Sequence, residues 1–127
     1  MSPPIPGEEW VRQYFRDVDA RDVRRILDYY APDASFRFGN NQPAIGTDAI
    51  AAMLQGFFDQ IDGMRHSPKG IWIGESDAVF EADVHFEVGN AAAEVPAVSI
   101  LRLDHANKIA DFRFVMDAQP VFEMMSS

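Results

Sequence analysis

A histidine and an aspartate near the ends of predicted elements are the residues most suited to acid–base chemistry. His66, in the segment MRHSPKG, follows the third predicted helix, and its imidazole could exchange a proton near neutral pH. Asp117 ends the last predicted strand, where strict alternation points it outward beside Arg113. A single β-bulge would turn Asp117 inward. We therefore predict a catalytic pair of His66 and Asp117, the alternative being an ordinary histidine at the edge of the core.

Three further polar residues are predicted to contact a ligand. Tyr14 lies on the apolar stripe of the first predicted helix, so its hydroxyl could reach an interior cavity. Ser99 interrupts an apolar strand face and could donate a hydrogen bond to a ligand oxygen. Asn40, with Asn41 beside it, lies in a Gly-Asn-Asn turn that we expect at the cavity mouth. The alternatives are a core tyrosine with a local partner, a tolerated small residue and a common turn residue.

Hydrophobic periodicity predicts the elements that position these residues. Helical spacing follows Glu8, Asp22 and Thr47, and we expect Asp22 and Thr47 to cap the second and third helices. The segment APD at 31–33 is expected to end the second helix, and Gly63 is placed to end the third. Alternation in ASFRF at 34–38 predicts a first strand that points Phe38 inward. Later strands are predicted near 65–75, 78–88, 93–104 and 108–117. This order indicates one α+β domain over residues 1–127, with an extended lead over 1–7 and a tail over 118–127.

The inner face of the predicted sheet is almost entirely apolar. Helices on one side of a curved antiparallel sheet leave a cavity at its open end, a usual place for small-molecule sites. Together with Asn40, the residues predicted to contact a flat or bulky apolar ligand are Phe38, Phe57, Phe80, Val84, Phe86, Phe112, Phe114 and Met116. The alternative is that these side chains fill a solid core.

The outer face of the predicted sheet combines charge with an apolar centre. Asp83, His85 and Glu87 share one strand face and resemble a metal triad in spacing, but a second histidine would be needed nearby. We interpret them as a charged outer or interface face and expect no metal. The strand VPAVSILRL is apolar on both faces, with Val98 and Ile100 outward. We therefore predict a homodimer through this outer face.

Composition narrows the possible partners and location. The 127 residues include 20 acidic and 11 basic side chains, giving a net charge of −9, so nucleic acid is an unexpected partner. No apolar run approaches the roughly 20 residues of a membrane span. The start MSPPIPGEEW lacks the features of a signal peptide, and cysteine is absent, so we expect a cytoplasmic protein without disulfides or cysteine nucleophiles.

Three phrases carry a resemblance to a known superfamily. They are VRQYFRDVDARDVRRILDYYAPDASFRF, the P-x-x-G-T-D-A-I pattern at 43–50, and KIADFRFVMD. Over roughly residues 8–122 the chain resembles the nuclear transport factor 2-like superfamily, in particular its SnoaL-like and ketosteroid isomerase-like branches. The resemblance implies a cone-shaped α+β barrel. It leaves function open, because the superfamily includes isomerases, cyclases, dehydratases, epoxide hydrolases and non-catalytic binding domains.

The resemblance carries over only part of the known catalytic sets. The phenolic donor of the isomerase matches Tyr14, but its general base falls on Phe38 and its protonated acid on Ser99. In the SnoaL-type cyclases the catalytic aspartate falls on Phe114 and the histidine on Ser99. A phenylalanine cannot move a proton, so the chain is not expected to be a ketosteroid isomerase.

These observations favour a cofactor-free enzyme of the cyclase, isomerase, dehydratase or hydrolase type. Its substrate would be the size of a polyketide, steroid or terpenoid. Two alternatives remain: a binding module for an apolar small molecule without turnover, and a dimerisation domain with a filled core.

Overall fold

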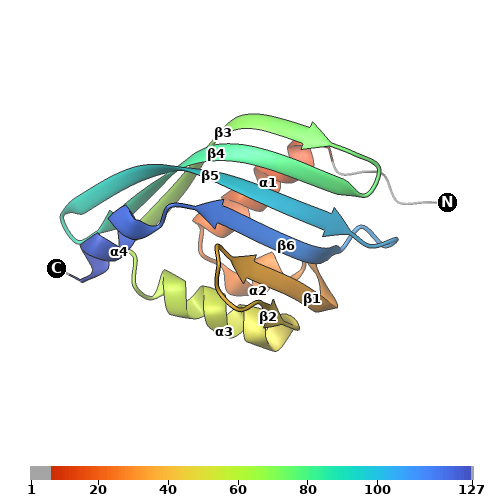
Figure 1. Ribbon diagram of the computed structural model, residues 1–127, viewed down its shortest axis with the longest axis horizontal. Coiled ribbons are helices and arrows are strands. Elements are labelled where there is room, and N and C mark those ends of the chain that lie inside the picture. The colour runs from red at the N-terminus through yellow and green to blue at the C-terminus, as the bar shows by residue number, and fades with distance from the viewer. Residues whose placement is uncertain (1–6, 127) are drawn as a thin grey trace.

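The computed structural model describes residues 7–126 as helices packed on one curved, unclosed sheet (Figure 1). The predicted lead over 1–7 lies outside the described residues, apart from Gly7, which precedes the first helix. The helices are α1 (Glu8–Asp19), α2 (Val23–Leu27), α3 (Thr47–Phe58) and α4 (Gln119–Met125). The strands are β1 (Tyr30–Phe38), β2 (Ala44–Ile45), β3 (Gly63–Ile73), β4 (Asp77–Val88), β5 (Ala91–Leu103) and β6 (Ile109–Met116).

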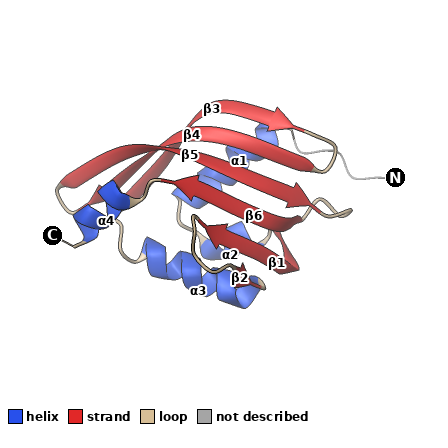
Figure 2. Cartoon of the chain, in the orientation of Figure 1, coloured by secondary structure: helices blue, strands red, loops and turns tan. Residues whose placement is uncertain are grey.

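The sheet confirms the predicted α+β class and adds a connection that alternation did not reveal. Its strand order is β2-β1-β6-β5-β4-β3, and β3 to β6 form an antiparallel meander. The last strand, β6, also pairs in parallel with the first long strand, β1, and places Phe112 opposite Phe36. As Figure 2 shows, α1, α2 and α3 lie together on one side of the sheet, while α4 lies beside the end of β6.

Local chemistry explains where the helices begin. The Asp22 carboxylate accepts a hydrogen bond from the Arg25 backbone N–H at 3.3 Å, which confirms the predicted cap of α2. Thr47 was predicted as the cap of α3, but Gly46 holds that place and Thr47 is the first helical residue. Gly46 has a φ of 87°, a conformation that side-chain-bearing residues rarely adopt.

Three other boundaries differ from the predicted ones. The segment APD at 31–33, expected to end the second helix, lies inside β1, where the pairing with β6 shifts between Tyr30 and Ser35. Gly63 begins β3 instead of ending α3. The predicted tail contains α4, which has a proline in its first turn and is anchored by the fully buried Val121.

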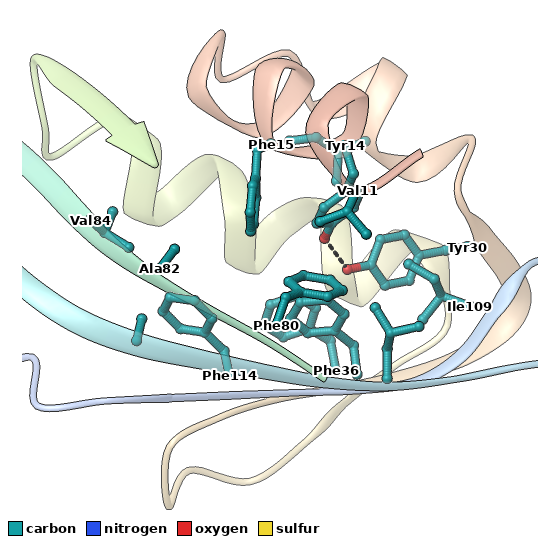
Figure 3. Close-up of a cluster of buried hydrophobic side chains, with 14 of the residues drawn as sticks. Val11, Tyr14, Phe15, Tyr30, Phe36, Phe80, Ala82, Val84, Ile109 and Phe114 are labelled. Carbon is teal, nitrogen blue, oxygen red and sulfur yellow. Dashed lines mark hydrogen bonds between the residues drawn. The ribbon is translucent and has the colours of Figure 1, made fainter. Parts of the chain in front are cut away.

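A single aromatic-rich core joins the helices to the sheet. Figure 3 shows Val11, Tyr14 and Phe15 of α1 above Phe80, Phe36 and Phe114 of the sheet. The Phe80 ring meets the Phe15 ring edge-on, with the two ring centroids 5.2 Å apart. Within residues 7–126 no helix is long and apolar enough to cross a membrane.

Candidate functional site

An apolar cavity of about 510 Å³ lies between the inner face of the sheet and the helices. Five of the predicted ligand contacts line it, namely Phe38, Phe57, Phe86, Phe112 and Phe114. They come from β1, α3, β4 and β6, so the alternating strands and one helix turn their aromatic side chains into the same space. This volume lies within the range of small-molecule pockets.

Four of the predicted contacts do not line the cavity. Phe80 and Val84 are buried in the core, and the Phe80 ring packs against Tyr14 and Phe15 of α1. Met116 packs against the core from the end of β6. Asn40 accepts a hydrogen bond from the Arg37 side chain at 3.1 Å, and the neighbouring Asn41 takes its expected place in the lining.

His66 lines the cavity from β3, and its partner is Asp19 at the end of α1. The His66 Nδ1 lies 2.6 Å from Asp19 Oδ1, while the His66 backbone N–H donates to Asp19 Oδ2 at 2.9 Å. The Phe15 ring stacks on the imidazole, with ring centroids 4.5 Å apart and an interplanar angle of 12°. The His66 side chain is only 4% exposed. These contacts hold the ring in one orientation.

The carboxylate of Asp19 also determines the tautomer of His66. A carboxylate can only accept, so the proton of a neutral imidazole lies on Nδ1 and the lone pair on Nε2. Among the residues described, none forms a hydrogen bond with His66 Nε2. His66 therefore lines the cavity with an imidazole of fixed orientation, in which Nε2 is the nitrogen that could accept a proton.

The predicted pairing of His66 with Asp117 is wrong. Asp117 is exposed, and its Oδ1 accepts a hydrogen bond from the Gln119 backbone N–H at 3.1 Å, beside the start of α4. The required bulge is absent from this end of β6, where Ala97 stays opposite Met116. The register shift between β5 and β6 lies at the other end of the pair, between Arg102 and Leu103.

Tyr14 lines the cavity and shares a hydrogen bond with Tyr30. Their hydroxyl oxygens lie 2.7 Å apart, as the dashed line in Figure 3 marks, and both side chains are buried. Burial raises the pKa of Tyr14 and of Tyr30 above that of an exposed tyrosine. Both phenols therefore keep their protons at neutral pH. When Tyr30 donates to Tyr14, the Tyr14 proton remains available to a ligand.

This buried pair predicts alkaline instability. A raised pKa in the folded state gives stability that is complete below about pH 10 and is lost as the pH rises toward the folded pKa. The double variant Tyr14→Phe, Tyr30→Phe is expected to lose less free energy of unfolding between neutral pH and strongly alkaline pH than the parent. Chemical denaturation at a series of pH values measures this difference. Equal slopes for the two proteins would contradict the prediction.

Ser99 and three carboxamides complete the polar part of the lining. Ser99 is buried on β5, between Phe80 of β4 and Phe114 of β6, and its side chain lines the cavity. Asn41, Gln42 and Gln60 also line the cavity, but they are exposed, which places them at its mouth. The oxygens of a ligand would therefore meet Tyr14 or Ser99 inside and carboxamides at the opening.

The outer-face residues that resemble a metal triad have ordinary partners. Asp83 forms an ion pair with Lys69 at 3.1 Å, and His85 lies 3.3 Å from Glu87. Residues 7–126 contain no group of three histidine, cysteine, aspartate or glutamate side chains placed to hold a metal ion.

Several lining residues were not predicted. Phe36 shares its strand face with Phe38, so alternation in ASFRF could have identified it. Phe15 belongs to the apolar stripe of the first helix. The pattern therefore predicts that it faces inward, but it does not show that the side chain reaches the cavity. Phe122 belongs to the unpredicted α4, and Asp19 reaches His66 only through the tertiary fold.

Comparisons with known proteins agree with this architecture. The family model of the SnoaL-like domain matches residues 11–112. No curated protein matches the chain. An NTF2-like protein of unknown function from Burkholderia pseudomallei has a TM-score of 0.82 and 18% identity, over 92% of this chain and 95% of its own.

Two other solved structures are similar in fold. TerC, crystallised with polyporic acid, has a TM-score of 0.79 and 17% identity, over 94% of this chain and 97% of its own. A candidate SnoaL-like polyketide cyclase from a Jannaschia species has a TM-score of 0.76 and 16% identity, over 92% of this chain and 91% of its own. Identities this low support the fold alone. Because the family model covers most of the chain, the protein belongs to the SnoaL-like family of the NTF2-like superfamily.

Proposed function

We propose that this protein is a cofactor-free acid–base enzyme whose substrate is a flat, apolar ketone or related carbonyl compound. One observation carries the proposal: His66 lies in the wall of an apolar cavity, with Nδ1 held by Asp19 and no protein partner for Nε2 among the described residues. An imidazole held in this way by a carboxylate is a suitable general base. Asp19 acts as a positioning residue.

The proposed reaction begins with removal of a proton next to a carbonyl group. His66 Nε2 takes the proton, and the electrons of the C–H bond form the carbon–carbon double bond of an enolate. The negative charge moves to the carbonyl oxygen, where the Tyr14 and Ser99 hydroxyls can donate hydrogen bonds. Where the enolate is conjugated with a further double bond, the imidazolium returns its proton to the remote carbon and the double bond shifts. Alternatively, the enolate carbon attacks a second carbonyl and closes a ring, and the resulting alkoxide takes the proton from the imidazolium.

The names of some structural neighbours fit this class of chemistry, while the similarity itself extends only to the fold. Several neighbours are described as candidate polyketide cyclases, and another was crystallised with polyporic acid. The chemistry itself comes from residues of this chain, because the cyclase acid–base positions inferred from the family resemblance are occupied here by Phe114 and Ser99. His66 and Asp19 would therefore replace that set from a different part of the fold.

Exchange of hydrogen for deuterium tests the proposal without knowledge of the final product. A panel of flat ketones and diketones is incubated with the protein in D₂O, and loss of the C–H signal next to the carbonyl is followed by proton NMR. The same panel is screened for shifts in melting temperature, since a bound ligand stabilises the folded state. Exchange should be accelerated for compounds that raise the melting temperature. Ligands that bind without any accelerated exchange would instead support the binding module.

The outer face of the sheet supports a second proposal, a homodimer. Val115 of β6 is 52% exposed, and Val98 lies opposite it on β5. Trp72 and Ile100 lie in the neighbouring row, on either side of Val79, so apolar side chains are exposed near the centre of the face. A second copy of the chain would cover them.

Substitution of Val115 by lysine tests this dimer. A lysine at the centre of the interface is expected to raise the dimer dissociation constant at least about tenfold, because its charge would be buried without a partner. Sedimentation at several protein concentrations measures the constant. Gln13→Lys adds the same charge on the exposed surface of α1 and should leave the constant unchanged. Monomeric parent protein at high concentration would contradict the proposal.

A further inference from the structure

The charge of the cavity wall indicates which ligands it can accept. Among the described residues that line the cavity there is no lysine, arginine, aspartate or glutamate. The polar lining consists of hydroxyl groups, carboxamides and the single imidazole of His66. We propose that the cavity accepts neutral ligands and excludes their carboxylate counterparts. This deepens the proposed function by limiting its substrate class, and it rests on the same cavity.

The pair of His66 and Asp19 does not provide a positive charge. When His66 is neutral, Asp19 leaves one negative charge directly behind the imidazole ring. When His66 is protonated, the two charges cancel over a distance of 2.6 Å. The net charge of the pair is therefore negative or zero. A carboxylate that entered the cavity would lose its hydration without gaining a cation.

The mouth of the cavity has the same character. Asn41, Gln42 and Gln60 offer amide N–H donors and carbonyl acceptors, which suit a hydroxyl, a ketone or an amide on the ligand. Arg37 lies on the strand that leads into this turn, but its guanidinium donates to the Asn41 carbonyl and to Asn40 Oδ1, each at 3.1 Å. These bonds hold the turn, and Arg37 does not belong to the lining.

The overall charge acts in the same direction. A net charge of −9 repels an approaching anion, although solution ions screen this effect. The screened repulsion would slow the entry of an anionic ligand. The lack of a cation in the lining would weaken the binding of that ligand once it has entered. Salt should therefore restore little of the affinity lost by an anionic ligand.

A pair of matched probes tests the inference. 2-Naphthamide and 2-naphthoate share one ring system and differ in a single terminal group, which is neutral in the first and ionised at neutral pH in the second. Their dissociation constants are measured by titration calorimetry with the parent protein at high salt. We expect the amide to bind and the carboxylate to bind at least about tenfold more weakly. Equal affinities, or failure of the amide to bind, would overturn the inference.

Two variants locate the origin of the preference. Gln42→Arg places a cation at the mouth and should reduce the ratio of the dissociation constants of 2-naphthoate and 2-naphthamide severalfold. Gln55→Arg adds the same charge on an exposed part of α3 outside the lining and should leave the difference unchanged. Equal narrowing in both variants would show that net charge alone sets the preference and would overturn the inference. Because these titrations measure affinity, a cavity that prefers the amide but catalyses no exchange would contradict only the proposed function.

Discussion

Replacement of His66 by glutamine is expected to lower the rate of C–H exchange by about 10²–10⁴-fold, the usual contribution of a general base. Glutamine preserves a polar side chain of similar size but cannot take up a proton in this pH range. The hydrogen bond to Asp19 can be retained by the glutamine amide, so the cavity should keep its shape. Ligand affinity, measured by the melting-temperature shift, should stay near that of the parent.

The variant Asp19→Asn tests whether Asp19 orients the His66 imidazole for catalysis or only stabilises the folded protein. If the new amide presents its oxygen to His66, it can still accept a hydrogen bond from Nδ1–H. If it presents its nitrogen, it donates to Nδ1, and the imidazole proton then lies on Nε2, which can no longer act as the base. We therefore expect the maximal exchange rate to fall while the substrate concentration at half-maximal rate changes little. A role limited to stability would instead lower the melting temperature and leave the maximal rate of the folded fraction unchanged.

His85 provides the matched control for the histidine substitution. It lies on the outer face of β4 beside Glu87, away from the cavity, so His85→Gln makes the same chemical change without touching the proposed base. Its exchange rate should equal that of the parent. An equal loss of rate in both histidine variants, or unchanged exchange in His66→Gln, would contradict the assignment of His66.

Phe80→Ala is expected to reduce the free energy of unfolding by about 3–5 kcal/mol, the largest stability effect that we predict. Phe80 is 1% exposed and packs against the rings of Tyr14 and Phe15, so its removal leaves a void between α1 and β4. Alanine also loses the burial of the aromatic ring itself. Chemical denaturation followed by circular dichroism measures the change.

Phe122→Ala is the matched comparison for this second prediction. Phe122 is also an aromatic residue, but it is 49% exposed and lines the cavity mouth from α4. Its truncation should cost less than about 1 kcal/mol, because little buried contact is lost. Similar losses in the two variants would indicate that Phe80 is not held in a tightly packed core.

Periodicity predicted the features that depend on neighbouring residues. Alternation in IADFRFVMD correctly turned Phe112 and Phe114 toward the helices, and a short polar side chain before an apolar run identified Asp22 as a cap. Periodicity did not predict which residues of one strand face are covered by a helix and which line the cavity. Phe80 and Phe86 share one face of β4, yet α1 covers the first and the cavity meets the second.

The partner of the histidine illustrates a different limit. Asp19 and His66 lie 47 positions apart, and their contact depends on how the end of α1 meets β3. Nothing in the local pattern distinguishes Asp19 from the other acidic residues of DVDARD. Asp117 was chosen instead because of its place at the end of a strand, and that choice required a bulge near Met116, where the pairing of β6 with β5 is regular.

The two edges of the sheet have a consequence for aggregation. An unpaired edge strand offers its backbone groups to other chains, which can lead to fibrous assembly. Here one edge is β2, which has only two residues, and the other is β3, whose pairing shifts between Pro68 and Gly70. Pro68 offers no backbone N–H, and Lys69 adds a charge beside it. Both edges therefore disfavour strand addition, so exposed apolar side chains can favour a closed pair of molecules without open-ended growth.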